Sequence, residues 1–222
     1  MTKAVRDASE FLCFNSGQMC TASTRFIVEE TAYEEFVERL TKEMSKVTMS
    51  YWREPGFQRG PIISQNQLDK ILNYIDIGKK EGANLTLGGN RIDRPGFYVE
   101  PTLFRDVTND MTIAQEEIFG PVGVAIKFKS GEGNVQEALR IANDSPYGLG
   151  GGVYSSDRSK TNMVVRKLQC GLVGSNTYWN LFADTPFGGY KQSGFGRELT
   201  SYGLEQYLET KSVIVDNSPP SK

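Results

Sequence analysis

Histidine is absent from this sequence of 222 residues. Without an imidazole, the chain can form neither a Ser–His nor a Cys–His catalytic pair, and it offers no histidine ligand for zinc. A general base supplied by these residues must therefore be a carboxylate, a lysine, a tyrosine or a bound water.

Cysteine is scarce. The three cysteines are Cys13, Cys20 and Cys170. Their odd number and the lack of a Cys-x-x-Cys spacing disfavour a disulfide framework and a metal knuckle. A single reactive thiol remains compatible with this pattern.

Long apolar runs and a signal-like start are also missing, since the chain begins Met-Thr-Lys-Ala-Val-Arg-Asp. We therefore expect a soluble protein without a membrane partner, located in the cytoplasm or present as the mature form of an organelle protein. Lys and Arg total 25 against 27 Asp and Glu, a net charge of −2. This balance disfavours a nucleic-acid partner held by electrostatics alone.

Apolar residues recur at helical spacing in several segments that alternate with strand-like runs. This alternation is typical of an α/β fold with a mainly parallel, open twisted sheet flanked by helices. One domain is favoured, because no linker rich in Pro, Gly or Ser interrupts the middle of the chain. We predict helices over 31–47, 64–82, 134–143, 157–169 and within 1–19, and strands over 26–28, 84–87, 98–104, 122–128, 151–154, 171–176 and 212–215.

Cys20 lies among small and polar residues immediately before a predicted strand. A thiol in such a loop can be exposed, and nearby backbone N–H groups can lower its pKa without a histidine. Considered alone, a lone cysteine is more often buried and inert. We expect Cys13 and Cys170 to be buried and inert in this way.

Two further segments carry candidate chemistry. Glu116 and Glu117 precede a turn and a strand, where one carboxylate could act as a base or bind a hydroxyl-rich ligand, the alternative being a solvated pair. Residues 186–198 contain four glycines within nine residues but match no phosphate-binding loop. Those glycines more plausibly let a loop turn tightly against other backbone.

These segments together resemble the aldehyde dehydrogenase superfamily. The resemblance rests on Phe14-x3-Gln18-x-Cys20-x4-Arg25, on the run 116–121 and on Pro186-Phe187-Gly188-Gly189-x-Lys191-x-Ser193-Gly194, in this order and spacing. Segments 96–102, 142–149 and 207–213 extend it over nearly the whole chain. It implies the catalytic-domain fold of that family and favours the reactive interpretation of Cys20.

The resemblance also implies a reaction and a cofactor. The residue matching Cys20 attacks a small-molecule aldehyde to give a thiohemiacetal, which passes hydride to NAD or NADP and leaves a thioester for water to hydrolyse. The Cys20 N–H would form half of the oxyanion hole. Glu117 matches the glutamate that holds the nicotinamide ribose, and Phe119 matches the aromatic residue beside the nicotinamide.

Residues near the substrate follow from the same resemblance. Met19 and Thr21 flank the nucleophile, Phe187 matches an aromatic residue at the substrate tunnel, and Asn176 matches an asparagine near the substrate. Aromatic residues such as Tyr178, Trp179 and Phe187 accept many aldehydes, so neither the aldehyde nor the choice between NAD and NADP is specified.

The resemblance implies a domain layout as well. We expect a catalytic domain over 1–206, an oligomerisation strand over 207–215 that pairs with a neighbouring subunit in a homo-oligomer, and a flexible tail over 216–222. Longer family members carry a cofactor domain, a glutamate base and a second oxyanion donor upstream of the part matched here. We therefore expect this chain by itself to be inactive and to bind no cofactor. The alternatives are a non-catalytic binding or self-association module and one chain of a split enzyme.

Overall fold

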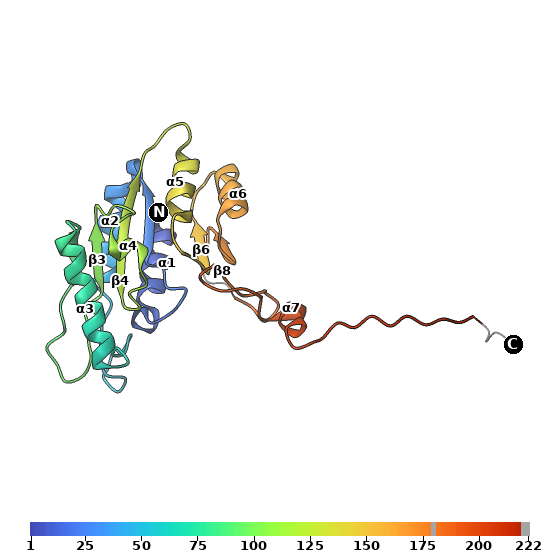
Figure 1. Cartoon of the computed structure of the whole chain (residues 1–222). Coiled ribbons are helices and arrows are strands. Elements are labelled where there is room, and N and C mark those ends of the chain that lie inside the picture. The colour runs from blue at the N-terminus through green and yellow to red at the C-terminus, as the bar shows by residue number, and fades with distance from the viewer. Residues whose placement is uncertain (179–180, 219–222) are drawn as a thin grey trace.

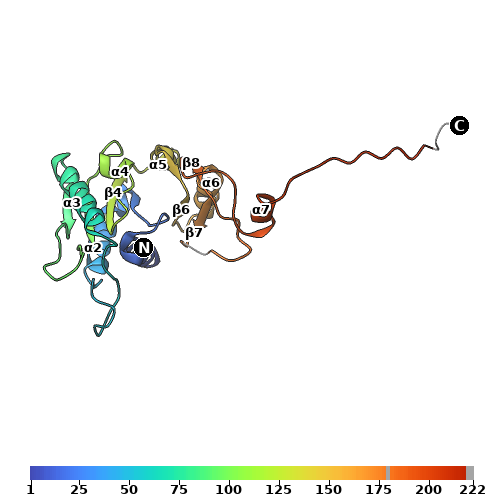
Figure 2. The same ribbon diagram turned by 60° about the horizontal axis from the view of Figure 1, so that its bottom comes forward.

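The computed structural model describes residues 1–178 and 181–218. Helices and strands form a layered body, from which the last helix and the C-terminal segment extend away (Figure 1, Figure 2). The helices are α1 (Thr2–Cys13), η1 (Phe14–Gly17), α2 (Glu30–Met44), α3 (Gln65–Lys80), α4 (Thr112–Gln115), α5 (Asn134–Asn143), α6 (Arg158–Lys167) and α7 (Thr200–Glu205).

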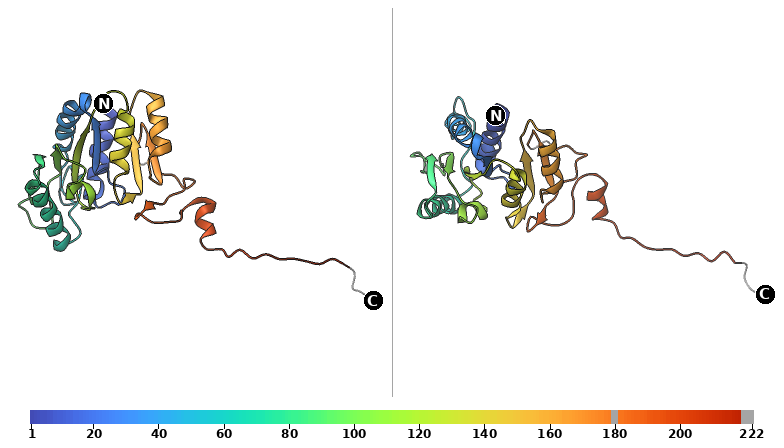
Figure 3. Two further views of the ribbon diagram at one scale, coloured as in Figure 1. Left: turned by 45° about the horizontal axis from the view of Figure 1, so that its top comes forward. Right: turned by 90° about the horizontal axis from the view of Figure 1, so that it is seen from above.

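The largest sheet has the strand order β1-β4-β3-β2. β4 pairs in parallel with both β1 and β3, whereas β2 pairs with β3 in the antiparallel direction. Helices cover both faces, and the central strand β4 is accordingly almost entirely buried (right panel of Figure 3). The strands are β1 (Arg25–Glu29), β2 (Asn84–Leu87), β3 (Thr102–Arg105) and β4 (Val122–Phe128).

Alternate residues of the central strands face opposite helices. On one face, Phe104 and Val124 belong to a core cluster with Leu68, Ile71 and Ile75 of α3. On the other face, the neighbouring residues of the strands pack with α1 and α2. That second cluster includes Leu12, Tyr33, Leu40, Leu103 and Ala125.

Two small sheets follow. β6 pairs in parallel with β7, with α6 as the connection between them, and β5 pairs with β8 in the antiparallel direction. The predicted α/β class is confirmed, and the described strands fall into one four-stranded and two two-stranded sheets. The small strands are β5 (Tyr147–Gly148), β6 (Gly150–Val153), β7 (Leu172–Ser175) and β8 (Tyr190–Lys191).

Most of the predicted elements are present. Ser64 caps α3 by accepting from the Gln67 N–H, and Asp157 caps α6. The predicted strand 98–104 is shorter than expected, because Pro101 has no N–H to donate and pairing with β4 starts at Thr102. The helices α4 and α7 and the strands β5 and β8 were not predicted.

Residues 208–217 are in no helix or strand, and the backbone runs away from the body (Figure 2). The predicted strand over 207–215 has no partner strand among the described residues, so its pairing with a second subunit stays a prediction. Residues 219–222 of the predicted tail lie outside the described residues. Within the described part, no helix is long and apolar enough to cross a membrane.

Candidate active site

Cys20 lies in a tight turn between η1 and β1. The Ala22 N–H donates to the Met19 carbonyl at 2.9 Å and closes this turn, and the Cys20 side chain is exposed. Among the described residues, no acceptor takes the Cys20 N–H. The turn therefore presents a thiol together with an unused backbone donor.

The other two thiols are less suited to nucleophilic chemistry. Cys13 is 0% exposed, and burial raises the pKa of its thiol to about 12. Cys170 is half-buried, and burial raises its pKa as well, although Lys191 and Arg25 act in the opposite direction. Because the thiolate is the reactive form, the structure favours Cys20 over both.

A glycine contact brings the end of η1, three residues before Cys20, against the segment 116–121. Gly17 has a φ of +72°, and a Cβ built there would overlap the Gly120 carbonyl and the nitrogen of Pro121. Only a glycine fits this close approach of two backbones. Two motifs that lie far apart in the sequence therefore meet in the fold.

Helix α3 holds the backbone of the segment 116–119. The Gln67 side-chain amide donates to the carbonyls of Ile118 (3.1 Å) and Phe119 (3.0 Å), and the Lys70 ammonium donates to the Glu117 carbonyl (3.2 Å). Our sequence analysis missed these donors. Gln67 and Lys70 lie three residues apart and therefore on one face of the helix, a spacing that lets both side chains reach the same segment.

The two neighbouring carboxylates differ in their surroundings. The Tyr74 hydroxyl donates to Glu116 at 2.6 Å, and this bond raises the pKa of Tyr74 to about 12. The Glu117 side chain is exposed, and its carboxylate has no hydrogen-bond partner among the described residues. Phe119, two residues later, is half-buried and has a φ of +58°. Glu117 is thus the carboxylate left available to a ligand.

The predicted substrate residues are placed in different ways. Met19 is half-buried, whereas Thr21 is only 2% exposed and its hydroxyl has no hydrogen-bond partner among the described residues. The side-chain amide of Asn176 makes two hydrogen bonds to the backbone of Ser155. Its oxygen accepts from the Ser155 N–H and its nitrogen donates to the Ser155 carbonyl, each at 2.9 Å. Among the described residues, none of these three side chains makes a hydrogen bond with Cys20.

Phe187 lies on the glycine-rich segment. It is half-buried and pairs with Glu198 through two backbone hydrogen bonds of 3.0 and 2.6 Å. Gly188, the next residue, approaches Gly171 so closely that a Cβ on Gly171 would overlap the Gly188 carbonyl. Within the segment, a Cβ on Gly188 would overlap the Gly196 carbonyl and one on Gly189 the Ser193 carbonyl, so these two glycines serve the predicted close backbone packing, whereas Gly194 has no atom within 4 Å. Trp179, the other predicted aromatic residue of this region, lies outside the described residues.

Residues 1–213 match the family model described as "Aldehyde dehydrogenase family". The chain belongs to the aldehyde dehydrogenase family. It is 45% identical to aldehyde dehydrogenase 1A1 of Mus musculus over 96% of this chain and 42% of that protein. It is 44% identical to cytosolic aldehyde dehydrogenase 2 of Macroscelides proboscideus over 97% of this chain and 88% of that sequence.

Solved structures of aldehyde dehydrogenases share the fold. An NAD+ complex of the enzyme from Bacillus cereus superposes with a TM-score of 0.93 at 43% identity, covering 98% of this chain and 43% of that one. A betaine aldehyde dehydrogenase from Staphylococcus aureus in complex with NAD+ gives 0.93 at 38% identity, with coverages of 99% and 44%. The chain thus spans less than half of the length of these aldehyde dehydrogenases.

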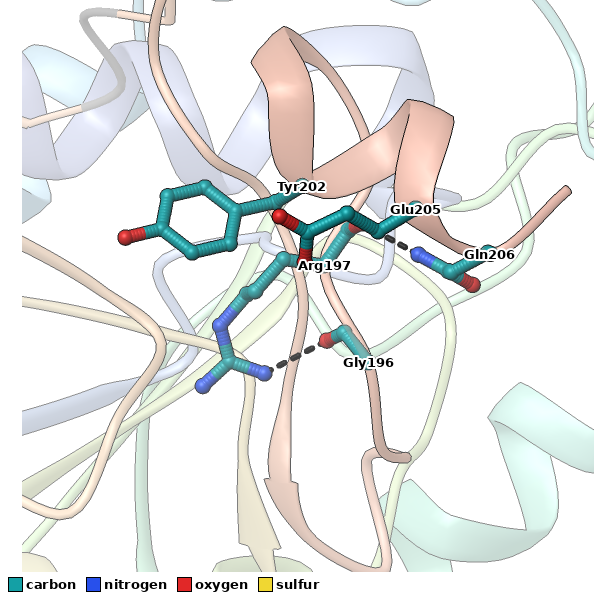
Figure 4. A pocket seen from close by; sticks show the side chains of 5 residues that line it. All are labelled: Gly196, Arg197, Tyr202, Glu205 and Gln206. Carbon is teal, nitrogen blue, oxygen red and sulfur yellow. Dashed lines mark hydrogen bonds between the residues drawn. The ribbon is translucent and has the colours of Figure 1, made fainter. Parts of the chain in front are cut away.

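A hollow of about 320 Å³ lies beside α7, apart from the residues of this family resemblance (Figure 4). It is lined by Gly196, Arg197, Tyr202, Glu205 and Gln206. The Arg197 guanidinium is engaged there, because it donates to the carbonyls of Gly196 (2.6 Å) and Gly189 (3.0 Å). Its lining contains no cysteine, so the Cys20 turn remains the candidate active site of this aldehyde dehydrogenase chain.

Proposed function

We propose that this chain is the thiol-bearing part of an aldehyde dehydrogenase that oxidises a small-molecule aldehyde to a carboxylate with NAD or NADP. One observation carries the proposal: an exposed cysteine, whose own N–H has no described acceptor, lies three residues after Gly17, whose backbone packs against the segment 116–121. We also propose a cytoplasmic location, in keeping with the cytosolic enzymes among its relatives.

The proposed first step is addition of the Cys20 thiolate to the aldehyde. A bond forms between sulfur and the carbonyl carbon, and the π electrons of the C=O bond move to oxygen. The Cys20 N–H is free to donate to that oxyanion, which makes it one half of an oxyanion hole. Within these 222 residues, which contain no histidine, the acceptor of the thiol proton is a carboxylate, a lysine, a tyrosine or a bound water.

The segment 116–119 fits a nicotinamide ribose. An ionised carboxylate accepts hydrogen bonds from two vicinal hydroxyls, and the Glu117 carboxylate is exposed and has no described partner. Phe119 offers an aromatic side chain beside it, and Gln67 and Lys70 keep the backbone in place. When bound, the nicotinamide supplies the acceptor for the hydride of the substrate.

We assign Met19, Thr21, Asn176 and Phe187 to the neighbourhood of the substrate. Met19 and Thr21 flank Cys20 directly. The Asn176 amide is saturated by Ser155, so its proposed contribution is to fix the chain after β7 rather than to donate to the aldehyde. Phe187 offers an apolar ring, which suits an aldehyde of low polarity.

The test uses an activated ester in place of an aldehyde. Thiolate attack on 4-nitrophenyl acetate expels 4-nitrophenolate and leaves an acetyl thioester, so the reaction needs the nucleophile and the oxyanion donor but no dinucleotide. We expect acetylation at Cys20 by peptide mass spectrometry and its loss in Cys20→Ser. The matched variant Cys170→Ser should react like the parent chain. Acetylation that persists in Cys20→Ser would remove the assignment of the nucleophile.

We do not expect these 222 residues alone to complete the oxidation. A second oxyanion donor is worth about a hundredfold to a thousandfold in rate, and a positioned base contributes roughly a hundredfold or more. Acetaldehyde, benzaldehyde and betaine aldehyde should therefore give no NADH or NADPH. Since the resemblance implies that longer family members bind the dinucleotide through a separate cofactor domain, calorimetry should also detect no binding of NAD+ or NADP+. A tight isotherm, or turnover that disappears in Cys20→Ser, would show that these residues suffice.

Self-association is the second candidate function, and the C-terminal segment favours it. Val213, Ile214 and Val215 are 74%, 96% and 68% exposed. An exposed apolar segment with strand-forming residues can pair with another sheet edge. This role is compatible with catalysis, since we propose that the complete aldehyde dehydrogenase is a homo-oligomer.

A further inference from the structure

Tyr178 connects the smaller sheets to the Cys20 turn. Its ring packs on Phe11 of α1, with ring centroids 5.4 Å apart, and its hydroxyl donates to the Thr21 carbonyl at 2.8 Å. The β6 strand leaves room for this ring because it carries glycine. A Cβ on Gly152 would lie 2.9 Å from Cδ2 of Tyr178, closer than a real Cβ comes to its neighbours.

The hydrogen bond from Tyr178 to the Thr21 carbonyl is linked to the Cys20 N–H through two peptide groups of the turn. The Thr21–Ala22 peptide is held at both ends, because its carbonyl accepts from Tyr178 and its N–H donates to the Met19 carbonyl. The Met19 carbonyl belongs to the same planar peptide as the Cys20 N–H. In a trans peptide these two groups point in opposite directions, so the orientation of one sets that of the other.

We propose that Tyr178 is a positioning residue that aims the Cys20 N–H at the oxyanion, acting through the Thr21–Ala22 peptide and the Met19 carbonyl. The proposal rests on the function proposed above, in which this N–H stabilises the oxyanion. Among the described residues, the Tyr178 hydroxyl bonds to the Thr21 carbonyl and makes no hydrogen bond with Cys20. Burial, together with the nearby Cys170 and Cys20, raises the pKa of its phenol, so the hydroxyl stays protonated and remains a donor at neutral pH.

Two reagents separate this role from general support of the fold. Acylation by 4-nitrophenyl acetate passes through an oxyanion, whereas alkylation by iodoacetamide is a direct displacement that forms none. Tyr178→Phe keeps the ring against Phe11 and removes only the hydroxyl. We expect the rate of Cys20 acylation to fall about fivefold to fiftyfold, since a misaligned donor costs up to about a hundredfold. The rate of Cys20 alkylation should change less than about twofold, because displacement uses no oxyanion donor.

Tyr33→Phe is the matched control. Tyr33 is 0% exposed and its hydroxyl also bonds to backbone, at the Ala125 carbonyl and the Asp106 N–H, but these partners lie away from the Cys20 turn. This variant should leave the ratio of acylation to alkylation unchanged. A Tyr178→Phe variant that slows both reagents equally, or slows neither, would overturn the proposal.

A second measurement keeps the inference separate from the proposed function. Amide hydrogen exchange should become faster at Ala22 in Tyr178→Phe and stay unchanged there in Tyr33→Phe. If the parent chain shows no Cys20 acetylation, the proposed function fails. The Ala22 exchange then decides by itself whether Tyr178 orients the turn, and unchanged exchange would refute that orientation.

Discussion

Limiting alkylation should distinguish the three thiols of this chain. The thiolate is the form that attacks iodoacetamide, so each rate follows both ionisation and access. With a pKa of about 12, roughly one Cys13 in ten thousand is ionised at pH 8. An ordinary free thiol with a pKa of about 8.5 is about one quarter ionised at that pH, a difference of roughly two-thousandfold.

Solvent access makes the expected difference in alkylation rate between Cys13 and Cys20 larger still. Cys13 is 0% exposed at the end of α1 and reacts only after local opening, whereas Cys20 is exposed in its turn. We therefore expect iodoacetamide, at less than one equivalent and near neutral pH, to modify Cys20 first. Peptide mapping by mass spectrometry measures the order, and Cys20→Ser should lower total labelling sharply. First labelling of Cys13 or Cys170 in the folded chain would refute this reasoning.

Three further predictions concern stability and assembly. Gly17→Ala should lower the free energy of unfolding in urea by about 2–4 kcal/mol, because the new Cβ overlaps backbone at a residue that already has a positive φ. The control Gly56→Ala has the positive φ but no atom within 4 Å of its Cβ, so it should cost about 1 kcal/mol. Burial raises the pKa of Asp7, but hydrogen bonds from Lys3 and Tyr154 outweigh it and the net shift is downward. The stability from this shift is therefore present above about pH 4 and is lost as the pH falls through the folded-state pKa. Tyr154→Phe should cost about 1.5–3 kcal/mol near neutral pH, and the difference from the parent should shrink in acid; a difference independent of pH would contradict this. Finally, light scattering should detect concentration-dependent dimers or larger species through residues 209–215, and a strict monomer over a wide concentration range would exclude such pairing.

Short-range patterns determined most of the fold. The strand β4 and the helix α5 occupy the residues predicted for them, 122–128 and 134–143, because β4 is an almost continuous apolar run and α5 carries an apolar repeat at helical spacing. The caps Ser64 and Asp157 were equally readable, since a cap acts within three residues. The elements α4, β5 and β8 contain only four or two residues, too few for a repeat, and pairs such as Tyr147 with Lys191 form only after the chain has folded back.

The sequence by itself determined that these 222 residues supply no imidazole, and its motifs singled out Cys20, Glu117 and Phe119. Only the tertiary structure decided which thiol is exposed and which carboxylate is left without a partner. The reason is that exposure and hydrogen bonding depend on neighbours from distant parts of the chain. Gly17 meets Gly120, and Tyr178 reaches Thr21, through the packing of whole helices and strands, which no local pattern of residues encodes.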